Sequence, residues 1–187
     1  MNIQGIAGLG SNGAAAAGGG IPFNLAVGTH FHVVCRDKRG NVKWTEDFHN
    51  LVVTAGRNEL IDKTFKGSGY TAAWYGGLVS ATPTVAAGDT MSSHAGWTEV
   101  TAYDEAVRQT LTLGTVASGS ANNSGSPMVF TISSDGTAVG GLFITTVSTK
   151  GGTTGTLYGA GAFTGGNKTL SDNDTLTVTA TLSITAS

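Results

Sequence analysis

The four histidines are the side chains of this sequence best suited to chemistry at neutral pH. His30 and His32 stand two positions apart in an alternating run, so in a strand they project from one face about 6–7 Å apart. That spacing suits two ligands of one zinc ion, and His49 is a candidate third ligand, while His94 lies far along the chain. No cysteine or acidic residue stands at a suitable ligand spacing, so we expect surface or interface histidines and no metal site.

Other catalytic patterns are missing or incomplete. The sequence contains no GxSxG elbow, P-loop or HExxH motif. Glu46 and Asp47 would point to opposite faces of one strand, and Glu99 and Asp104 are distant from them, so no carboxylate pair of the glycosidase type is indicated. Residues 172–174 (DND) resemble the start of a calcium loop but lack its glycine and its final glutamate, which favours a polar turn. We expect no catalytic residues, no cofactor and no enzymatic activity.

A GxGxxG match at Gly8–Gly13, with Asp37 near the end of a later strand, suggests a dinucleotide site. Such a site requires a strand and a crossover helix around the glycines, whereas here AAAAGGGIP follows and no βαβ unit is indicated. Residues 1–20 are instead a low-complexity Gly/Ala segment that cannot offset its ordering entropy alone. We predict a flexible arm at 1–20, ordered only against a neighbour, and a single domain at 21–187.

The amino-acid composition limits the classes of partner that this chain is expected to bind. The chain has 187 residues, a net charge of −2 and only 12% charged residues, against about 25% in typical soluble domains. No basic cluster indicates nucleic-acid binding, no apolar run is long enough for a membrane helix, and no basic n-region indicates a secretory signal. The single cysteine, Cys35, excludes an intramolecular disulfide, and its alternating apolar run predicts a buried thiol. Low charge with abundant Thr, Ser and Gly suggests a protein packed in an assembly.

The stretch from Leu25 to Phe65 predicts a β-hairpin and one short helix. Alternation places Phe31, Val33 and Cys35 on one face of the first strand, and Val42, Trp44, Glu46 and Phe48 on one face of the second. Residues 37–41 form the turn between them, with Gly40 at positive φ. A helix is expected over 55–66, with Thr54 as N-cap and Gly67 after its end. Its stripe of Leu60, Ile61, Thr64 and Phe65 would lie on a sheet.

The remainder predicts a mainly β fold, an antiparallel β-sandwich of jelly-roll type. Expected strands are 74–79, 96–100, 108–116, 127–133, 137–147, 156–163 and 175–185. Asp135-Gly136 predicts a hairpin turn, residues 102–108 a helical turn with an Asp104–Arg108 pair, 80–95 a long loop and 117–126 a mobile loop tip. Trp44, Trp74, Tyr75 and Trp97 are interpreted as core anchors, with Trp74 or Tyr75 at a surface.

Two segments resemble small virion structural proteins of tailed bacteriophages. These are KWTEDFHNLVVTAGRNELIDKTF and WYGGLVSATPTVAAGDTMSSHAGWTEVTAYDEAVRQTLT. They carry an HNLVVxxG start, a WYxGL strand, an AAGDTM–GWTEVTAY loop and strand, and an acidic element followed by arginine, within residues 42–113. The 1–20 arm and the C-terminal strands lie outside this resemblance.

The resemblance implies a non-enzymatic capsid decoration (cement) protein with a sandwich or jelly-roll fold. Its partners would be the major capsid protein and itself, as a homo-dimer or trimer, with no nucleic acid and no membrane. It would be located on the capsid surface of the virion and assembled in the bacterial host cytoplasm. The alternatives are a tail or fibre-adaptor component, and a carbohydrate- or receptor-binding β-sandwich that stacks its ligand on an exposed aromatic such as Trp74.

Overall fold

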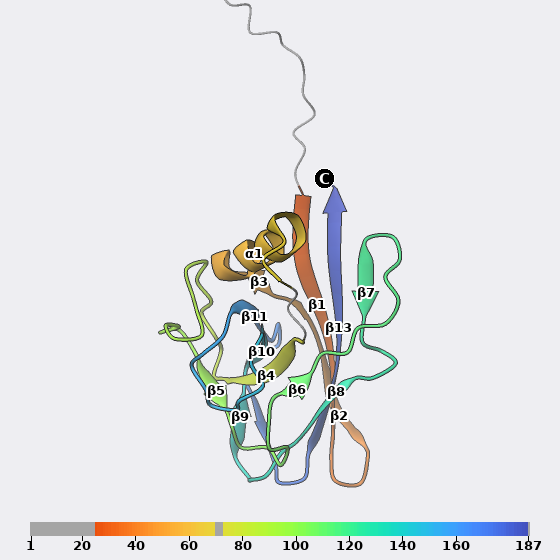
Figure 1. Ribbon diagram of the computed structural model, residues 1–187. Helices are drawn as coiled ribbons and strands as arrows, with labels where there is room; N and C mark the ends of the chain where they lie inside the picture. The colour runs from red at the N-terminus through yellow and green to blue at the C-terminus, as the bar shows by residue number, and fades with distance from the viewer. Residues whose placement is uncertain (1–24, 70–72, 187) are drawn as a thin grey trace, which may run out of the picture.

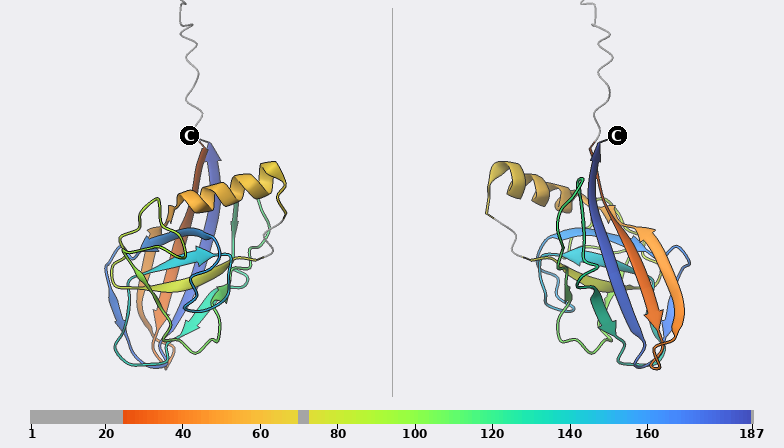
Figure 2. Two further views of the ribbon diagram at one scale, coloured as in Figure 1. Left: turned by 60° about the vertical axis from the view of Figure 1, so that its left-hand side comes forward. Right: turned by 90° about the vertical axis from the view of Figure 1, so that its right-hand side faces the viewer.

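The structure is a computed structural model that describes residues 25–69 and 73–186. The predicted arm at 1–20 and the GxGxxG match at Gly8–Gly13 lie outside the described residues. Two large antiparallel sheets, of five and six strands, enclose the main core. The strands of one sheet run steeply across those of the other (Figure 2). The predicted mainly β, antiparallel sandwich-like fold with one short helix is confirmed.

The five-stranded sheet is built on the first and last described strands. β1 (Leu25–Arg36) pairs along its whole length with β13 (Thr175–Ala186), from Leu25↔Ala186 to Arg36↔Thr175. β2 (Val42–His49) adds to the other side of β1, while β7 (Ser120–Asn122) and β8 (Met128–Thr131) both add to β13. Figure 1 shows β1 and β13 as the two longest arrows, side by side.

The six-stranded sheet faces this layer. Its order is β3 (Leu51–Val52), β11 (Leu157–Ala162), β10 (Gly141–Thr145), β4 (Tyr75–Ser80) and β5 (Thr98–Val100), with β6 (Gln109–Thr110) also on β4. β9 (Thr137–Val139) and β12 (Lys168–Leu170) form a separate two-stranded sheet. Every residue of β10 is buried, because the predicted 80–95 loop covers the outer face with Met91, and Trp97 just beyond that loop packs there too.

The predicted hairpin is confirmed. Phe31, Val33 and Cys35 are fully buried, whereas His30 and His32 lie on the outer face of the sheet. The Asp37 carboxylate accepts hydrogen bonds from the Asn41 side chain and from the backbone N–H groups of Asn41 and Arg39, and these bonds lower its pKa. Gly40 closes the turn at φ 86°.

Burial also decides the chemistry of the one cysteine. Loss of solvent around Cys35, reinforced by the nearby Asp174 carboxylate, raises the pKa of its thiol to about 12. The thiolate is the reactive form of cysteine, so this side chain is an inert part of the core. The prediction of a buried thiol is confirmed.

Two predictions of local structure around the C-terminal half are wrong. Gly136 does turn the chain, at φ 77°, but no hairpin forms there, because β8 pairs with β13 and β9 pairs with β12. The predicted loop tip at 117–126 contains β7, which pairs with residues 181–183 of β13. In both cases the strand partner lies far away in sequence. A turn motif is a local signal and does not indicate which distant strand will pair.

The helix has the predicted extent but not the predicted buried face. α1 (Thr54–Ile61) continues as a π-helical turn, η1 (Asp62–Lys66), and Gly67 ends it at φ 73°. The N-cap is Val53 rather than Thr54, whose hydroxyl accepts a hydrogen bond from Arg57 within the helix. Ile61 and Phe65 point outward, with exposed fractions of 58% and 84%. The expectation that the stripe lies on a sheet therefore holds in part for Leu60, which packs partly buried against the main core, and is wrong for Ile61, Thr64 and Phe65.

The residue that α1 buries is Gly56. A Cβ atom at this position would clash with the backbone carbonyl of Tyr158 in β11, so only glycine allows the helix to lie this close to the strand. The first turns of the helix are thus held against β11, and the later turns extend beyond the sheets (Figure 2).

Replacing Gly56 with alanine should therefore destabilise the fold. In a solvent-exposed helix this change would stabilise by about 1 kcal/mol, because alanine is the better helix former. Here the overpacking against Tyr158 should reverse the sign and cost about 1–3 kcal/mol in the free energy of unfolding. Urea denaturation measures this, with Asn58→Ala at an exposed position of the same helix as the control; a Gly56→Ala protein at least as stable as wild type would contradict the close approach.

Candidate interaction surface

The structure brings three of the four histidines together. His30 and His49 are opposite one another across β1 and β2, with ring centroids 5.0 Å apart. Asp47 lies opposite His32, and its Oδ1 is 3.0 Å from Nδ1 of His32 and 3.3 Å from Nε2 of His30. Sequence spacing could not reveal this carboxylate, because strand register places it there. In the described ranges, no three or more His, Cys, Asp or Glu residues are arranged to hold a metal ion.

His94 has a structural setting away from that cluster. Its ring stacks on Trp97 at a centroid distance of 3.7 Å, and its Nδ1–H donates to the Trp97 carbonyl. The Trp97 indole N–H donates to Asp89, which also accepts from the backbone N–H of Ala86. These bonds fix the 80–95 loop over the outer face of the six-stranded sheet.

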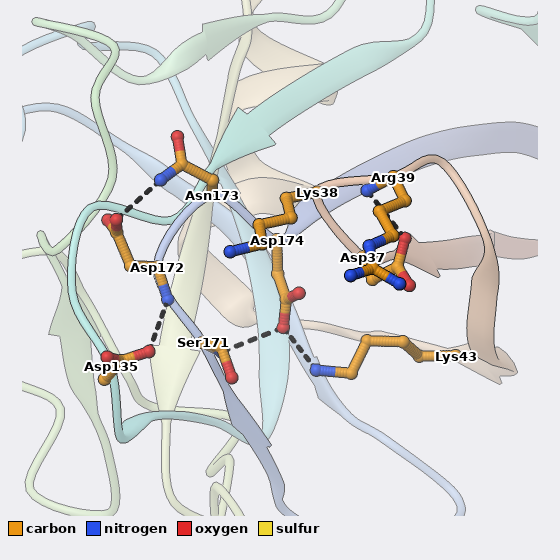
Figure 3. A pocket seen from close by; sticks show the side chains of 9 residues that line it. All are labelled: Asp37, Lys38, Arg39, Lys43, Asp135, Ser171, Asp172, Asn173 and Asp174. Atoms are coloured by element: carbon orange, nitrogen blue, oxygen red, sulfur yellow. Dashed lines mark hydrogen bonds and ion pairs between the residues drawn. The ribbon is translucent and has the colours of Figure 1, made fainter.

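A charged cleft of about 450 Å³ opens beside the β1–β2 turn (Figure 3). It is lined by Asp37, Lys38, Arg39, Lys43, Asp135, Ser171, Asp172, Asn173 and Asp174. The buried Asp174 carboxylate accepts from the Lys43 ammonium and from the backbone N–H of Ser171. Asp135 accepts from the backbone of Asp172, whose own carboxylate accepts from Asn173. These bonds hold one turn against another, in agreement with the predicted polar turn at 172–174, where Asn173 takes φ 65°.

Glu46 is a second buried carboxylate with an internal role. It accepts from the Lys168 ammonium at 2.7 Å and from the backbone N–H of Gly165 at 3.0 Å. Burial alone would raise the pKa of Glu46, but these hydrogen bonds outweigh it and the pKa lies below the usual range. Lys168 also lies over the Trp44 ring. The group ties the loop after β11 to the edge strand β2.

Arg108 is the largest fully buried polar side chain of the described residues. Its guanidinium makes two hydrogen bonds to Glu99, from Nε at 2.9 Å and from Nη2 at 2.7 Å. It also donates to the carbonyls of Val147 and Gly152, and it lies over the Phe143 ring. The predicted Asp104–Arg108 pair is wrong, because residues 104–107 form bends rather than a helical turn.

The tryptophans serve the core, as predicted. Trp97 is buried, and Trp44 and Trp74 pack partly buried against the main core. Trp74 meets Tyr158 edge-on, with ring centroids 5.5 Å apart. Its ring is therefore engaged, at least on that side, in packing within the protein.

Apolar side chains are exposed around the helix instead. A groove of about 180 Å³ lies between α1, β1, β7 and β13, and we call it the apolar groove; its walls include Val27, Leu60, Leu113, Val116, Leu182 and Ile184. On the helix itself, Ile61 and Phe65 form an exposed pair that we call the apolar ridge. The hydrophobic pattern predicts neither surface, because it places the ridge in the core and Leu113 and Val116 in a strand.

No protein-family model, curated protein or solved structure matches the chain. Within 25–69 and 73–186, no helix has the length and apolar character needed to cross a membrane. The function must therefore be inferred from the molecule's own residues and surface.

Removing the Arg108 guanidinium should be severely destabilising. Arg108→Met would leave the buried Glu99 carboxylate and two carbonyls without their partner, and breaking a buried ion pair in this way costs about 3–5 kcal/mol. Arg39→Ala in the exposed hairpin turn is the matched control and should change the free energy of unfolding by less than about 0.5 kcal/mol. Equal effects of the two substitutions in chemical denaturation would refute the structural role of Arg108.

Acid should weaken the fold partly through Glu46. Its pKa is lower in the folded than in the unfolded state, so the unfolded state binds more protons in the acidic range and stability rises with pH there. The contribution is fully present above the unfolded value of 4.5 and is lost as pH falls through the folded pKa. Thermal melts between pH 3 and 7 should show a shallower acid dependence for Glu46→Gln than for wild type or for the exposed control Asp104→Asn. An unchanged slope would contradict the assignment.

Proposed function

We propose that the protein is a non-enzymatic structural component of a bacteriophage virion, a capsid decoration protein that binds the outside of the head shell and stabilises it. The observation that carries this proposal is the distribution of charged and apolar side chains among the described residues. Strong ion pairs face inward, while large apolar side chains stay at the surface. The resemblance of residues 42–113 to small phage virion proteins points in the same direction.

The charged groups of the described chain mainly hold the fold together. Arg108 is paired with Glu99, Lys43 with Asp174, and Lys168 with Glu46. In the charged cleft, Asp174 is the carboxylate paired with Lys43, and Asp135 accepts a hydrogen bond from the backbone of Asp172. Such a surface has few groups left for an ionic ligand or a nucleic acid, both of which are recognised by a concentrated field of one sign.

Apolar exposure supports a protein that is covered in an assembly. Nine large hydrophobic side chains among the described residues are exposed: Val42, Leu51, Ile61, Phe65, Val107, Leu113, Val116, Val129 and Ile184. Three of these, Leu113, Val116 and Ile184, line one groove, and contiguous apolar surfaces on a soluble protein mark sites that partners bury. On a symmetric shell, modest contacts of this kind repeat many times, and avidity makes the attachment strong without any single tight site.

The proposed partners are the major capsid protein and further copies of this chain. The proposed location is the capsid surface of the virion, after assembly in the bacterial cytoplasm. A β-sandwich with internally paired charges suits this role, because it presents a stable body whose outer surface can be largely apolar.

Quantitative mass spectrometry of purified particles tests the proposal. A decoration protein should be present in a copy number comparable with that of the major capsid protein, and electron microscopy should place it over the shell. Particles that lack it should release their DNA at lower temperature than complete particles, and adding the purified protein should restore the difference. A few copies located at a vertex or tail would assign it to the tail or fibre adaptor instead, and its absence from particles would refute a virion role.

A further inference from the structure

The apolar groove lies at the end of the sandwich where the two longest strands outrun the rest of the sheet. β1 and β13 continue past the neighbouring strands toward α1 (Figure 1), and Val27 and Ile184 stand opposite one another in this part of the ladder. Leu60 of α1 forms the facing wall, and Tyr158 also lines the groove. Val116, at the rim, is 72% exposed. The opening is therefore mostly apolar, and it is bounded by α1, the β1–β13 ladder, β7 and the irregular segment that carries Leu113 and Val116.

The apolar ridge stands on the same helix. Ile61 and Phe65 are four residues apart and so lie on one side of it. Phe65 is the most exposed large hydrophobic side chain of the described residues, at 84%. Gly67 ends the helical turn two residues later, and Asp62 accepts from the Ser68 hydroxyl, so the chain that carries Phe65 is fixed locally. The ridge is thus a protruding knob on an ordered support.

The groove has the size for one such knob. Its volume, about 180 Å³, is below the roughly 300–1,000 Å³ typical of small-molecule sites. Protein interfaces, in contrast, place single aromatic anchors in pockets of this scale, and those anchors carry most of the binding energy. A second protein surface is therefore a better occupant than a free ligand.

We propose that this surface joins two copies of the chain, with Phe65 of each copy seated in the apolar groove of the other. One helix carries the knob and one wall of the groove, since Leu60 lines the groove and Phe65 follows five residues later. A two-fold axis between two such surfaces forms both contacts at once, which is the self-complementarity that closed dimers require.

The exposed area is appropriate for a dimer. Ile61, Phe65, Leu113, Val116 and Ile184 together present roughly 500 Å² per copy, given that a large aromatic side chain covers about 150–250 Å². A standard interface buries about 800 Å² per partner. These side chains would supply more than half of that area as its apolar centre.

The charges beside the ridge on one copy are also complementary to the same charges on a second copy. Lys66 lies 3.2 Å from Asp62 on the exposed side of η1, so the rim carries one positive and one negative group. When two such helices lie antiparallel, Lys66 of one copy comes beside Asp62 of the second copy and the reverse. The rim then attracts rather than repels, and the dimer forms without an unpaired charge.

Sedimentation velocity over a range of concentrations tests the proposal on the purified full chain, without any capsid. Wild type should dimerise, and Phe65→Asp should raise the dimer dissociation constant by about 30-fold or more, the effect typical of a buried aromatic anchor. Val42→Asp is the matched control, since Val42 is similarly apolar and exposed but lies beside the β1–β2 turn, at the opposite end of the molecule (Figure 1). A wild type that remains monomeric up to about 100 μM, the weak end of functional association, would overturn the proposal.

Disulfide trapping tests which residues meet. Phe65→Cys and Val116→Cys are purified separately, mixed and oxidised, while the buried native Cys35 stays unreactive. A mixed disulfide that forms in the mixture, and faster than either variant links to itself, supports the proposal. Self-linked Phe65→Cys as the main product would overturn it, as would a dimer unaffected by Phe65→Asp. A dimer lost only on deletion of residues 1–24 would assign the groove to that segment instead.

The outcome is separable from that of the proposed function. A monomeric Phe65→Asp protein that still binds shells would support the dimer surface and the capsid role as independent properties. Dimers that fail to bind shells would overturn the capsid role alone.

Discussion

The pairing of β1 with β13 is the constraint on which the rest of the structure depends. Twelve residues near the start of the described chain pair with twelve at its end, and β2, β7 and β8 attach only to these two strands. The five-stranded sheet therefore cannot be completed until β1 and β13 pair, and contacts of such high sequence separation are slow to form. The strands of the six-stranded sheet lie between β1 and β13 in the sequence, and this sheet packs on one face of the five-stranded sheet. The same two strands, by continuing past their neighbours, also make a wall of the apolar groove.

Buried ion pairs hold in place the loops and turns that lie outside the strand ladders. Arg108 holds the 147–152 segment through two carbonyls, Glu46 and Lys168 hold the loop after β11, and Lys43 and Asp174 join the two turns beside the charged cleft. Each pair loses hydration on folding, so each is stable only because further hydrogen bonds complete its environment. This use of charge explains how a chain with 12% charged residues still contains several buried ones, and why little charge remains for a ligand.

Much of the fold was predictable because alternation is a local signal. The buried set of Phe31, Val33 and Cys35 and that of Leu176, Val178 and Ala180 follow directly from residues that are two positions apart. The errors concern partners rather than elements. Asp135-Gly136 does form a turn, yet strands on its two sides join different sheets, and Asp47 meets His30 and His32 only through strand register. Side-chain types encode neither the distant partners of β8 and β9 nor the register of β2 on β1, so neither the candidate surface nor the strand order could be predicted.

The error at the helix is different in kind, because it bears on function. A hydrophobicity pattern assigns Ile61 and Phe65 to the core. Nothing in that pattern shows that Gly56, which has no side chain, is the residue at which the helix approaches the Tyr158 backbone most closely. Once Gly56 rests on Tyr158, the orientation of α1 is decided, and the two large side chains must face solvent. An isolated fold gains nothing from an exposed phenylalanine, so this conflict between local pattern and global packing is the kind found where a surface is kept for a partner. The contact of Gly56 with Tyr158 inside the protein thus determines that Ile61 and Phe65 are exposed at the surface.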